Sequence, residues 1–551
     1  MTTQHTTRCF RSALVAVAAL ASTTAVNAQQ GATYEVVSSF GATDGRPNGV
    51  IQTRDGQFYG TTAGGGAATD VRRVSGTVFA MDTAGARTTL HTFYFCPTCS
   101  FFLADGTPLS NLFEGPDGSL YGTTHNPSLT VFPEGQIFRI RPAGDFTTLS
   151  TVHWLRAGVI QARDGRLYGT AYGEQINTFL HSYGFVFRVE ANGTDRVLHE
   201  FDGTDSAFPA AELVEIDDGS LYGTTEGGFF FPSPGLPPPD PPTPIPGAIF
   251  RLDPVTGSFA IRHVFSGPDG SRPTGRLIQG TDGLIYGTTT EGGAYGFGTV
   301  FSFDAAGTLT TLHHFAGHDG ANPGAGVIQG FDGRLYGITG NGGAFNYGTV
   351  FVMNVTGGLT TLHDFVSGEG TNPVNELFQA NDGTFYGAAA TNGPDGGGVI
   401  FRVRLTTTPS DQYFEIVSRN SDKCLDVFGA STDASASVIQ WICHGGPNQQ
   451  WRLEPAGGGA VRIIARHSGQ ALDVFGASLD DVAPIIQWPV HGGDNQAWTL
   501  EPASDGYVRI VARHSGKAMD VEFASPDDGA RVIQFTPHGG ANQQWLLRPA
   551  P

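Results

Sequence analysis

Apolar and polar residues alternate along most of this chain in short runs, and nearly every run ends at glycine, aspartate or proline. Residues 262 to 315 show the pattern clearly, with four apolar runs separated by turns such as Thr281-Asp-Gly283. This alternation predicts short β-strands joined by tight hairpins, because glycine accepts a positive φ without a steric clash. No window shows a helical period, so we expect an all-β protein.

One unit of this pattern is repeated. Its core is Asp-Gly, then two residues of which the second is usually apolar, then Tyr-Gly, with the tyrosines at Tyr59, Tyr121, Tyr168, Tyr222, Tyr286, Tyr336 and Tyr386. A period near 50 residues is typical of propeller blades. The third strand of the unit also occurs seven times, but the fourth follows it only six times, and the missing copy is residues 34–40. We therefore predict a seven-bladed β-propeller over residues 29–408, with strand 34–40 completing the last blade.

The loops of the unit differ between the two faces of the predicted ring. The hairpin turns of one face are short and uniform, whereas the loops of the other face are long and variable, so binding is expected there. The variable loops carry six aromatic residues, which either stack on sugars or, as we favour, pack against neighbouring blades: Phe229, Phe230, Tyr295, Phe297, Phe345 and Tyr347.

In the first 408 residues, no residue pattern points to a catalytic or metal site. Seven copies of the Asp-Gly aspartate indicate turn chemistry rather than catalysis. The loop acids Glu174, Glu226 and Glu291 could supply a glycosidase pair, but no spacing selects two of them. The histidines of the fourth strand have no partners at metal-ligand spacing. We predict no catalytic residue, no metal and no cofactor.

A different repeat begins after residue 410, with a period of 47 residues. Each copy contains an Asp, an aromatic residue, a His-Gly-Gly step and an Asn-Gln-x-Trp motif. Three equal repeats of short strands predict a β-trefoil over residues 411–551.

These motifs resemble the ricin-type lectin family, a β-trefoil with three Gln-x-Trp motifs. The resemblance implies carbohydrate binding in each lobe by an Asp, an aromatic ring and an Asn: Asp426, Trp441 and Asn448; Asp473, Trp488 and Asn495; Asp520, Phe535 and Asn542. It implies a structural role for Gln449 with Trp451, Gln496 with Trp498, and Gln543 with Trp545. The propeller repeats resemble the GloVer family of bacterial secreted proteins, which implies no activity.

One feature departs from the lectin pattern. The family often has glutamine two residues before the aromatic residue, whereas this chain has it one residue before, at Gln440, Gln487 and Gln534. In a strand this shift turns the side chain to the opposite face, so we expect one ligand hydrogen bond to be missing.

Residues 1–28 are predicted to be a secretory signal peptide, with Arg8 and Arg11 before a short apolar run and a small-residue cleavage site at Ala28. In an oxidising compartment the remaining cysteines should form disulfides. The lectin resemblance implies the pair Cys424 and Cys443, and we favour a disulfide over a metal or redox site for Cys96 and Cys99. The net charge of −20 argues against nucleic acid, and no later run is long enough for membrane insertion.

The sequence thus predicts a secreted carbohydrate-binding protein whose trefoil binds polysaccharide or glycoconjugate, with the propeller as scaffold or second binding module. Two alternatives stay open. One is an extracellular glycoside hydrolase or lyase with a catalytic propeller, and the other is a surface propeller that binds a protein partner at its long-loop face.

Overall fold

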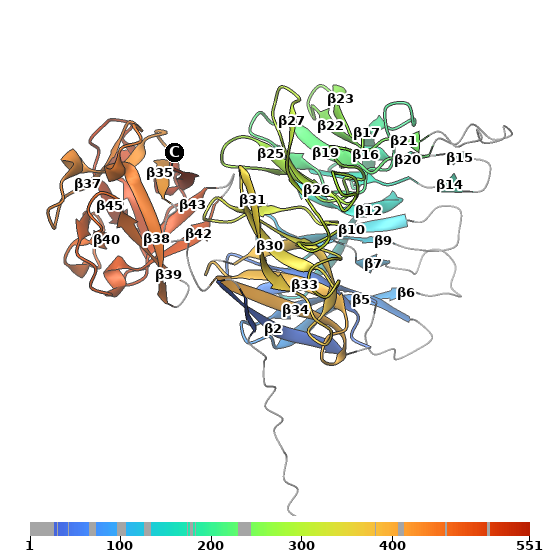
Figure 1. Cartoon of the computed structure of the whole chain (residues 1–551), viewed down its shortest axis with the longest axis horizontal. Helices are drawn as coiled ribbons and strands as arrows, with labels where there is room; N and C mark the ends of the chain where they lie inside the picture. Colours follow the sequence, from blue (N-terminus) through green and yellow to red (C-terminus); the bar gives the residue numbers. More distant parts are fainter. Residues whose placement is uncertain are drawn as a thin grey trace, which may run out of the picture.

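The computed structural model describes residues 27–29, 31–41, 43–64, 73–95, 106–108, 110–125, 134–173, 175–176, 180–181, 183–229, 244–380, 382–405, 413–457, 460–503 and 507–550. Two all-β domains follow each other along the chain, and they lie side by side in Figure 1. Among the described residues no helix has the length and apolar character needed to cross a membrane.

The first domain is a seven-bladed β-propeller, as predicted, and each blade is an antiparallel sheet. Blade 1 contains β3 (Arg46–Gln52), β4 (Phe58–Ala63), β5 (Arg73–Met81) and β6 (Arg87–Phe95). Blade 2 contains β7 (Thr107–Pro108), β8 (Phe113–Glu114), β9 (Leu120–His125), β10 (Glu134–Ile140) and β11 (Phe146–His153). Blade 3 contains β12 (Leu155–Gln161), β13 (Leu167–Ala171), β16 (Phe185–Val189) and β17 (Asp195–Glu200). Blade 4 contains β18 (Val214–Glu215), β19 (Leu221–Thr225), β22 (Ala248–Leu252) and β23 (Phe259–Val264). Blade 5 contains β24 (Ile278–Gln279), β25 (Ile285–Thr289), β26 (Thr299–Phe303) and β27 (Leu309–His314). Blade 6 contains β28 (Ile328–Gln329), β29 (Leu335–Thr339), β30 (Thr349–Asn354) and β31 (Gly357–Asp364). Two small loop hairpins pair β14 (Gln175–Ile176) with β15 (Leu180–His181) and β20 (Gly228–Phe229) with β21 (Pro244–Ile245).

Blade 7 is built from both ends of the domain. Its strands β32 (Thr371–Gln379), β33 (Phe385–Thr391) and β34 (Gly396–Leu405) are completed by β2 (Ala32–Gly41), and β1 (Asn27–Gln29) pairs with β2 at the outer edge. The antiparallel register runs from Ala32 opposite Leu405 to Gly41 opposite Gly396. The buried Tyr34 also stacks on His363 of blade 6, with 3.9 Å between ring centroids. The closure inferred from the missing strand is therefore present.

The repeated Asp-Gly unit forms the hairpin between the first and second strands of each blade. In blade 6, Asp332 accepts a hydrogen bond from the Arg334 backbone N–H at 3.1 Å and from the Tyr336 hydroxyl at 2.6 Å. The aspartate thus fixes the turn to the start of the next strand. This arrangement gives the recurring motif a structural role at the turn.

Side chains at the ends of the first strands join neighbouring blades at this hairpin face. At five boundaries between blades, a Gln or Glu side chain of the later blade accepts a hydrogen bond from a backbone N–H of the preceding blade. That N–H belongs to the residue just before the repeated aspartate. Gln329, for example, accepts from Thr281 at 2.8 Å and donates to the Gly333 carbonyl at 2.9 Å. Gln329 and Gln379, which donates to the Gly383 carbonyl at 3.2 Å, thus each satisfy turns of two blades at once.

The seam between blades 2 and 3 lacks this bond. The residue before the repeated aspartate of blade 2 is Pro116, which has no N–H to donate. Gln161 of blade 3 keeps its bond to the Gly165 carbonyl at 2.9 Å, but its Oε1 is buried without a hydrogen-bond partner. A proline in one turn therefore leaves an acceptor unsatisfied in the next blade.

We expect Gln329→Ala to lower the free energy of unfolding by about 2 kcal/mol and Gln161→Ala by about 1 kcal/mol. Only the first change leaves a backbone N–H, that of Thr281, without its hydrogen-bond acceptor. Equilibrium unfolding in urea measures both. In a Pro116→Ala background, which restores the N–H, the cost of Gln161→Ala should rise toward that of Gln329→Ala. Equal costs in the original background would contradict the assignment.

The central channel of the propeller is crossed by a ring of residues at one equivalent position of the seven blades, formed by Gly49, Asn111, Gly158, Glu212, Arg276, Gly326 and Glu376. Cavities of about 100 and 390 Å³ lie on its two sides. The Arg276 guanidinium lies 3.1 Å from the Glu376 carboxylate and 4.0 Å from that of Glu212. A Cβ at Gly158 would lie 1.8 Å from Glu212 Oε1, so a larger residue there would force the Glu212 side chain to move.

Glu212 is the less well paired of the two carboxylates. Burial raises the pKa of Glu212 to about 7, while Arg276 opposes the rise and Glu376 adds to it. The folded state therefore holds a proton that the unfolded chain releases at lower pH. The stabilisation is complete below the ordinary pKa of glutamate and is lost as the pH rises through about 7.

We expect Glu212→Gln to have little effect on stability near pH 4.5 and to stabilise the protein by about 2 kcal/mol at pH 8. The full pKa shift corresponds to roughly 3 kcal/mol. We discount it because Glu212 keeps 21% of its side-chain surface exposed. Thermal unfolding across this pH range provides the measurement. Glu376→Gln, which breaks the close contact with Arg276, should instead destabilise at pH 8, and a pH-independent effect of Glu212→Gln would refute the account.

The second domain is a β-trefoil, also as predicted. Six strands close a barrel in the order β35 (Phe414–Ser418), β38 (Gln450–Gly457), β39 (Ala460–Ala465), β42 (Trp498–Pro502), β43 (Val508–Ala512) and β46 (Trp545–Pro549). Three hairpins cover one end: β36 (Cys424–Val427) with β37 (Val438–Trp441), β40 (Ala471–Val474) with β41 (Ile485–Trp488), and β44 (Ala518–Val521) with β45 (Val532–Phe535). The three Gln-x-Trp tryptophans lie in the core with no exposed surface.

Candidate functional site

Each trefoil lobe brings an aspartate and an aromatic ring to the outer face of its hairpin. In the first lobe Asp426 lies opposite Ile439 and Trp441 opposite Cys424, so the two side chains leave the hairpin on the same side. Asp426 is 4% exposed and Trp441 is 37% exposed. The corresponding pairs are Asp473 with Trp488 and Asp520 with Phe535.

A short 3-10 turn supplies the asparagine of each lobe: η3 (Pro447–Gln449), η5 (Asp494–Gln496) and η7 (Ala541–Gln543). Asn448 Nδ2 donates to the Asp426 carboxylate at 3.0 Å, Asn495 to Asp473 at 2.9 Å, and Asn542 to Asp520 at 3.0 Å. The structure thus brings the predicted Asp and Asn of every lobe into direct contact.

A histidine that the sequence analysis did not assign to the site also reaches each aspartate. His491 Nε2 lies 3.1 Å from Asp473, and the equivalent distances are 3.4 Å for His444 to Asp426 and 3.2 Å for His538 to Asp520. The Gly493 backbone N–H donates to His491 Nδ1 at 3.1 Å, so the neutral ring carries its proton on Nε2 and donates it to the carboxylate. The recurrence of His-Gly-Gly every 47 residues was the signal, but it served only to count repeats.

Burial changes the pKa of the site aspartates in the first and third lobes. It raises the pKa of Asp426, and hydrogen bonds from Gln449, His444 and Asn448 oppose the rise. The pKa of Asp520 is raised for the same reason. A carboxylate held in this way is ordered by its donors before any ligand arrives, and it keeps acceptor capacity because it offers about four lone-pair positions.

The Gln-x-Trp residues hold the strands that carry these groups. The Trp451 indole N–H donates to the Leu425 carbonyl at 3.0 Å, one residue before Asp426, and the other two tryptophans bond the equivalent carbonyls at 3.2 and 3.1 Å. Gln449 accepts from the His444 N–H at 2.8 Å and donates to the Ile442 carbonyl at 3.0 Å. The motif therefore positions the Asp, His and aromatic residues of its own lobe.

The shifted glutamines lie on the inner side of the hairpins, fully buried. Gln440 donates to the Ser525 carbonyl at 2.7 Å and to the Asp527 carbonyl at 3.0 Å, both in the third lobe. Gln487 and Gln534 make the same bonds to the first and second lobes. These side chains join the three hairpins to one another and do not face the sites.

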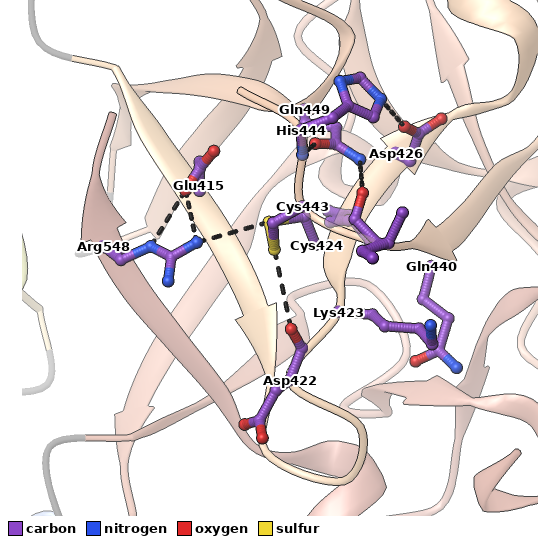
Figure 2. Close-up of a disulfide and its surroundings, with 12 residues drawn as sticks. Glu415, Asp422, Lys423, Cys424, Asp426, Gln440, Cys443, His444, Gln449 and Arg548 are labelled. Atoms are coloured by element: carbon purple, nitrogen blue, oxygen red, sulfur yellow. Dashed lines mark hydrogen bonds and ion pairs between the residues drawn. A yellow bond between two sulfur atoms is a disulfide. The ribbon is translucent and has the colours of Figure 1, made fainter. Parts of the chain in front are cut away.

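The predicted disulfide between Cys424 and Cys443 is present in the first lobe (Figure 2), next to Arg548, which pairs with Glu415. Figure 2 also shows His444 reaching Asp426 from the same segment. A loop of about 20 residues closed in this way stabilises by roughly 3 kcal/mol. Cys96 and Cys99 lie outside the described residues.

The third lobe differs at its rim. Where the first two lobes have Gly429 and Gly476 at φ of 65° and 63°, the third has Phe523 at φ 58°. Its side chain is 93% exposed, so no packing compensates for the left-handed backbone.

We expect Phe523→Gly to raise the free energy of unfolding by about 1 kcal/mol, because it relieves the left-handed strain at the cost of some chain entropy. Differential scanning calorimetry would show a higher midpoint for the trefoil transition. Phe523→Ala is the matched control, since it removes the ring and keeps the strain. A rise of the same size in the control would place the effect in the side chain instead.

Two of the candidate acids of the propeller loops, Glu226 and Glu291, share Arg272 as their partner. Arg272 donates to Glu226 at 2.9 Å through Nε and to Glu291 at 2.7 Å through Nη1. Glu174 lies outside the described residues. In four blades the fourth-strand histidine contacts an acid of the connection to the next blade at 2.6 to 2.8 Å, as His263 contacts Asp269. Among the described residues no cluster of three or more potential ligands could hold a metal ion.

Comparison with family models names both repeats. Residues 243–423 match the Gloeobacter/Verrucomicrobia repeat, and residues 400–488 and 490–551 match the ricin-type β-trefoil lectin domain-like family. Both resemblances inferred from the sequence are confirmed.

Among solved structures, the designed three-fold symmetric protein ThreeFoil is 56% identical over 25% of this chain and 97% of its own, with a TM-score of 0.25. The Macrolepiota procera ricin B-like lectin, in complex with lactose, is 21% identical over 26% of this chain and 99% of its own, with a TM-score of 0.23. A catalytically inactive virginiamycin B lyase from Staphylococcus aureus with quinupristin is 13% identical over 68% of this chain and 99% of its own, with a TM-score of 0.45. Comparison with the curated proteins gives no match.

Proposed function

We propose that this chain, whose C-terminal domain is a ricin-type β-trefoil lectin-like domain, is a secreted carbohydrate-binding protein with three sugar sites on the trefoil. The observation that carries the proposal is the arrangement repeated in every lobe. A buried aspartate, oriented by Asn and His, lies on the same hairpin face as a partly exposed aromatic ring.

The chemistry of this arrangement suits a sugar ring. The carboxylate accepts from ligand hydroxyls, the Asn and His groups complete the polar contacts, and the aromatic ring covers the apolar face of the pyranose. The histidines keep 42 to 44% of their side-chain surface exposed, so they can also meet a ligand. We assign the sugar contacts in the first lobe to Asp426, Trp441, His444 and Asn448, and to the equivalent residues of the other lobes.

The ligand we expect is a polysaccharide or a glycosylated surface. Shallow single sites bind weakly, but three sites on one rigid domain gain avidity on a polymer with repeated sugars. We further infer that residues 1–28 are removed as a signal peptide, that residues 29–408 and 411–551 act as separate domains, and that neither binds nucleic acid. Catalysis is not part of the proposal, because the loop acids Glu226 and Glu291 are both paired with Arg272.

We expect the combined variant Trp441→Ala, Trp488→Ala and Phe535→Ala to weaken binding of the full mature chain to its polysaccharide by at least tenfold, since each ring supplies roughly 1 kcal/mol of stacking. Glycan arrays followed by affinity electrophoresis give the measurement. The partly exposed rings should allow the variant to fold, which its melting temperature checks. Val255→Ala, at a 92% exposed propeller turn, is the control.

Two results would count against this function. Unchanged glycan binding by the triple variant would remove the three sites. Release of reducing ends or unsaturated products from any polysaccharide by the wild-type chain would favour the hydrolase or lyase alternative.

A further inference from the structure

Two neighbouring propeller loops each hold two aromatic side chains out toward solvent. Tyr295 and Phe297 lie between β25 and β26, and Phe345 and Tyr347 lie between β29 and β30. They are 63, 41, 57 and 38% exposed, respectively. These four rings are therefore not buried between blades, although the Phe297 ring also lies against Gly317 of the connection to blade 6. The side chains of Phe229 and Phe230 lie outside the described residues.

The two loops have the same hydrogen-bonded backbone. Gly293 donates to the Gly267 carbonyl at 2.8 Å, and Gly298 donates to the Gly292 carbonyl at 3.0 Å. The equivalent bonds of the next blade run from Gly343 to Gly317 at 2.9 Å and from Gly348 to Gly342 at 3.1 Å. Both loops are thus fixed by their backbone to the preceding inter-blade turn, and they carry the rings at the surface.

Asn322 fixes one loop relative to the other. Its backbone N–H donates to the Phe297 carbonyl at 2.9 Å, and its Nδ2 donates to the Thr290 carbonyl at 2.9 Å. Its Oδ1 accepts from Asn341 Nδ2 in the second loop at 3.2 Å. The four rings therefore belong to one rigid surface that spans blades 5 and 6, which we call the aromatic platform.

The chemistry between the rings favours a carbohydrate over a protein surface. Each of the four rings keeps between 38 and 63% of its surface exposed, so each can present its own face to a ligand. The exposed Asn341, Asn346 and His318 lie in the same loops and the turn between them. The ring of Phe297 lies over Gly317, where an added Cβ would be 3.5 Å away. Separate rings alternating with hydrogen-bonding groups match the alternating apolar faces and hydroxyls of a sugar chain.

We propose that the aromatic platform of Tyr295, Phe297, Phe345 and Tyr347 is a second polysaccharide-binding site, in which successive sugars of one chain stack on rings of adjacent blades. Its rigidity lowers the entropic cost of binding, because no loop has to be ordered by the ligand. The site lies on the propeller and uses none of the trefoil residues. It goes beyond the lectin function and can be tested separately.

Affinity electrophoresis of the full mature chain through gels containing β-1,3-glucan, xylan, galactan or mannan provides the test. The platform variant combines Tyr295→Ala, Phe297→Ala, Phe345→Ala and Tyr347→Ala. Val197→Ala, at a 48% exposed position on β17, is the matched control. Each protein is made with the wild-type trefoil and with the three trefoil aromatic residues changed to alanine.

We expect the platform variant to weaken binding to at least one of these polysaccharides about tenfold or more, corresponding to roughly 1.4 kcal/mol. Residual retardation of the trefoil variant should disappear when the platform changes are added, while Val197→Ala has no effect. If the platform variant binds all four polysaccharides as the wild type does, the proposal is overturned, whatever the trefoil variant shows. Loss of binding by the trefoil variant combined with no effect of the platform variant would support the lectin sites alone and reject the platform.

Discussion

The backbone hydrogen bonds between β2 and β34 are the interaction on which the first domain depends. They join residues 32–41 to residues 396–405, so the blade that closes the ring is shared by the two ends of the domain. Without this pairing, β34 would present an open edge and the seven blades would form an unclosed array. Ring closure also fixes the distances across the channel, where Arg276 of blade 5 meets acids of blades 4 and 7.

The trefoil reaches a fixed geometry by a different route. A buried tryptophan in each lobe bonds the carbonyl next to the site aspartate, and a buried glutamine bonds the hairpin of a neighbouring lobe. The three sites therefore depend on one core, but each site is oriented by residues of its own repeat. A change at the rim of one lobe, such as Phe523 in the third, alters that lobe and leaves the other two intact.

Much of this architecture follows from the sequence because both domains are repetitive. The strand count placed the closing strand, and the one-residue shift of Gln440 correctly placed its side chain on the inner face. Properties that depend on several blades at once were not predictable. The channel ring has four residue types over the seven blades, three glycines, two glutamates, an asparagine and an arginine, so it leaves no motif. The exposure of Tyr295 depends on how its loop folds back. His444 was visible as a repeat marker, but its contact with Asp426 required the turn geometry.

The missing bond at Pro116 has a consequence for how the ring comes apart. A closed ring of seven sheets has seven boundaries between blades, whereas the junction of the chain ends lies within blade 7. Blade 7 is held together there by a long antiparallel ladder, whereas the boundary at Gln161 lacks a contact found at five others. Local opening of a folded protein is easier where fewer contacts hold two elements together. We expect the boundary between blades 2 and 3 to open more readily than it would with a backbone N–H at position 116, because proline offers no hydrogen-bond donor to Gln161.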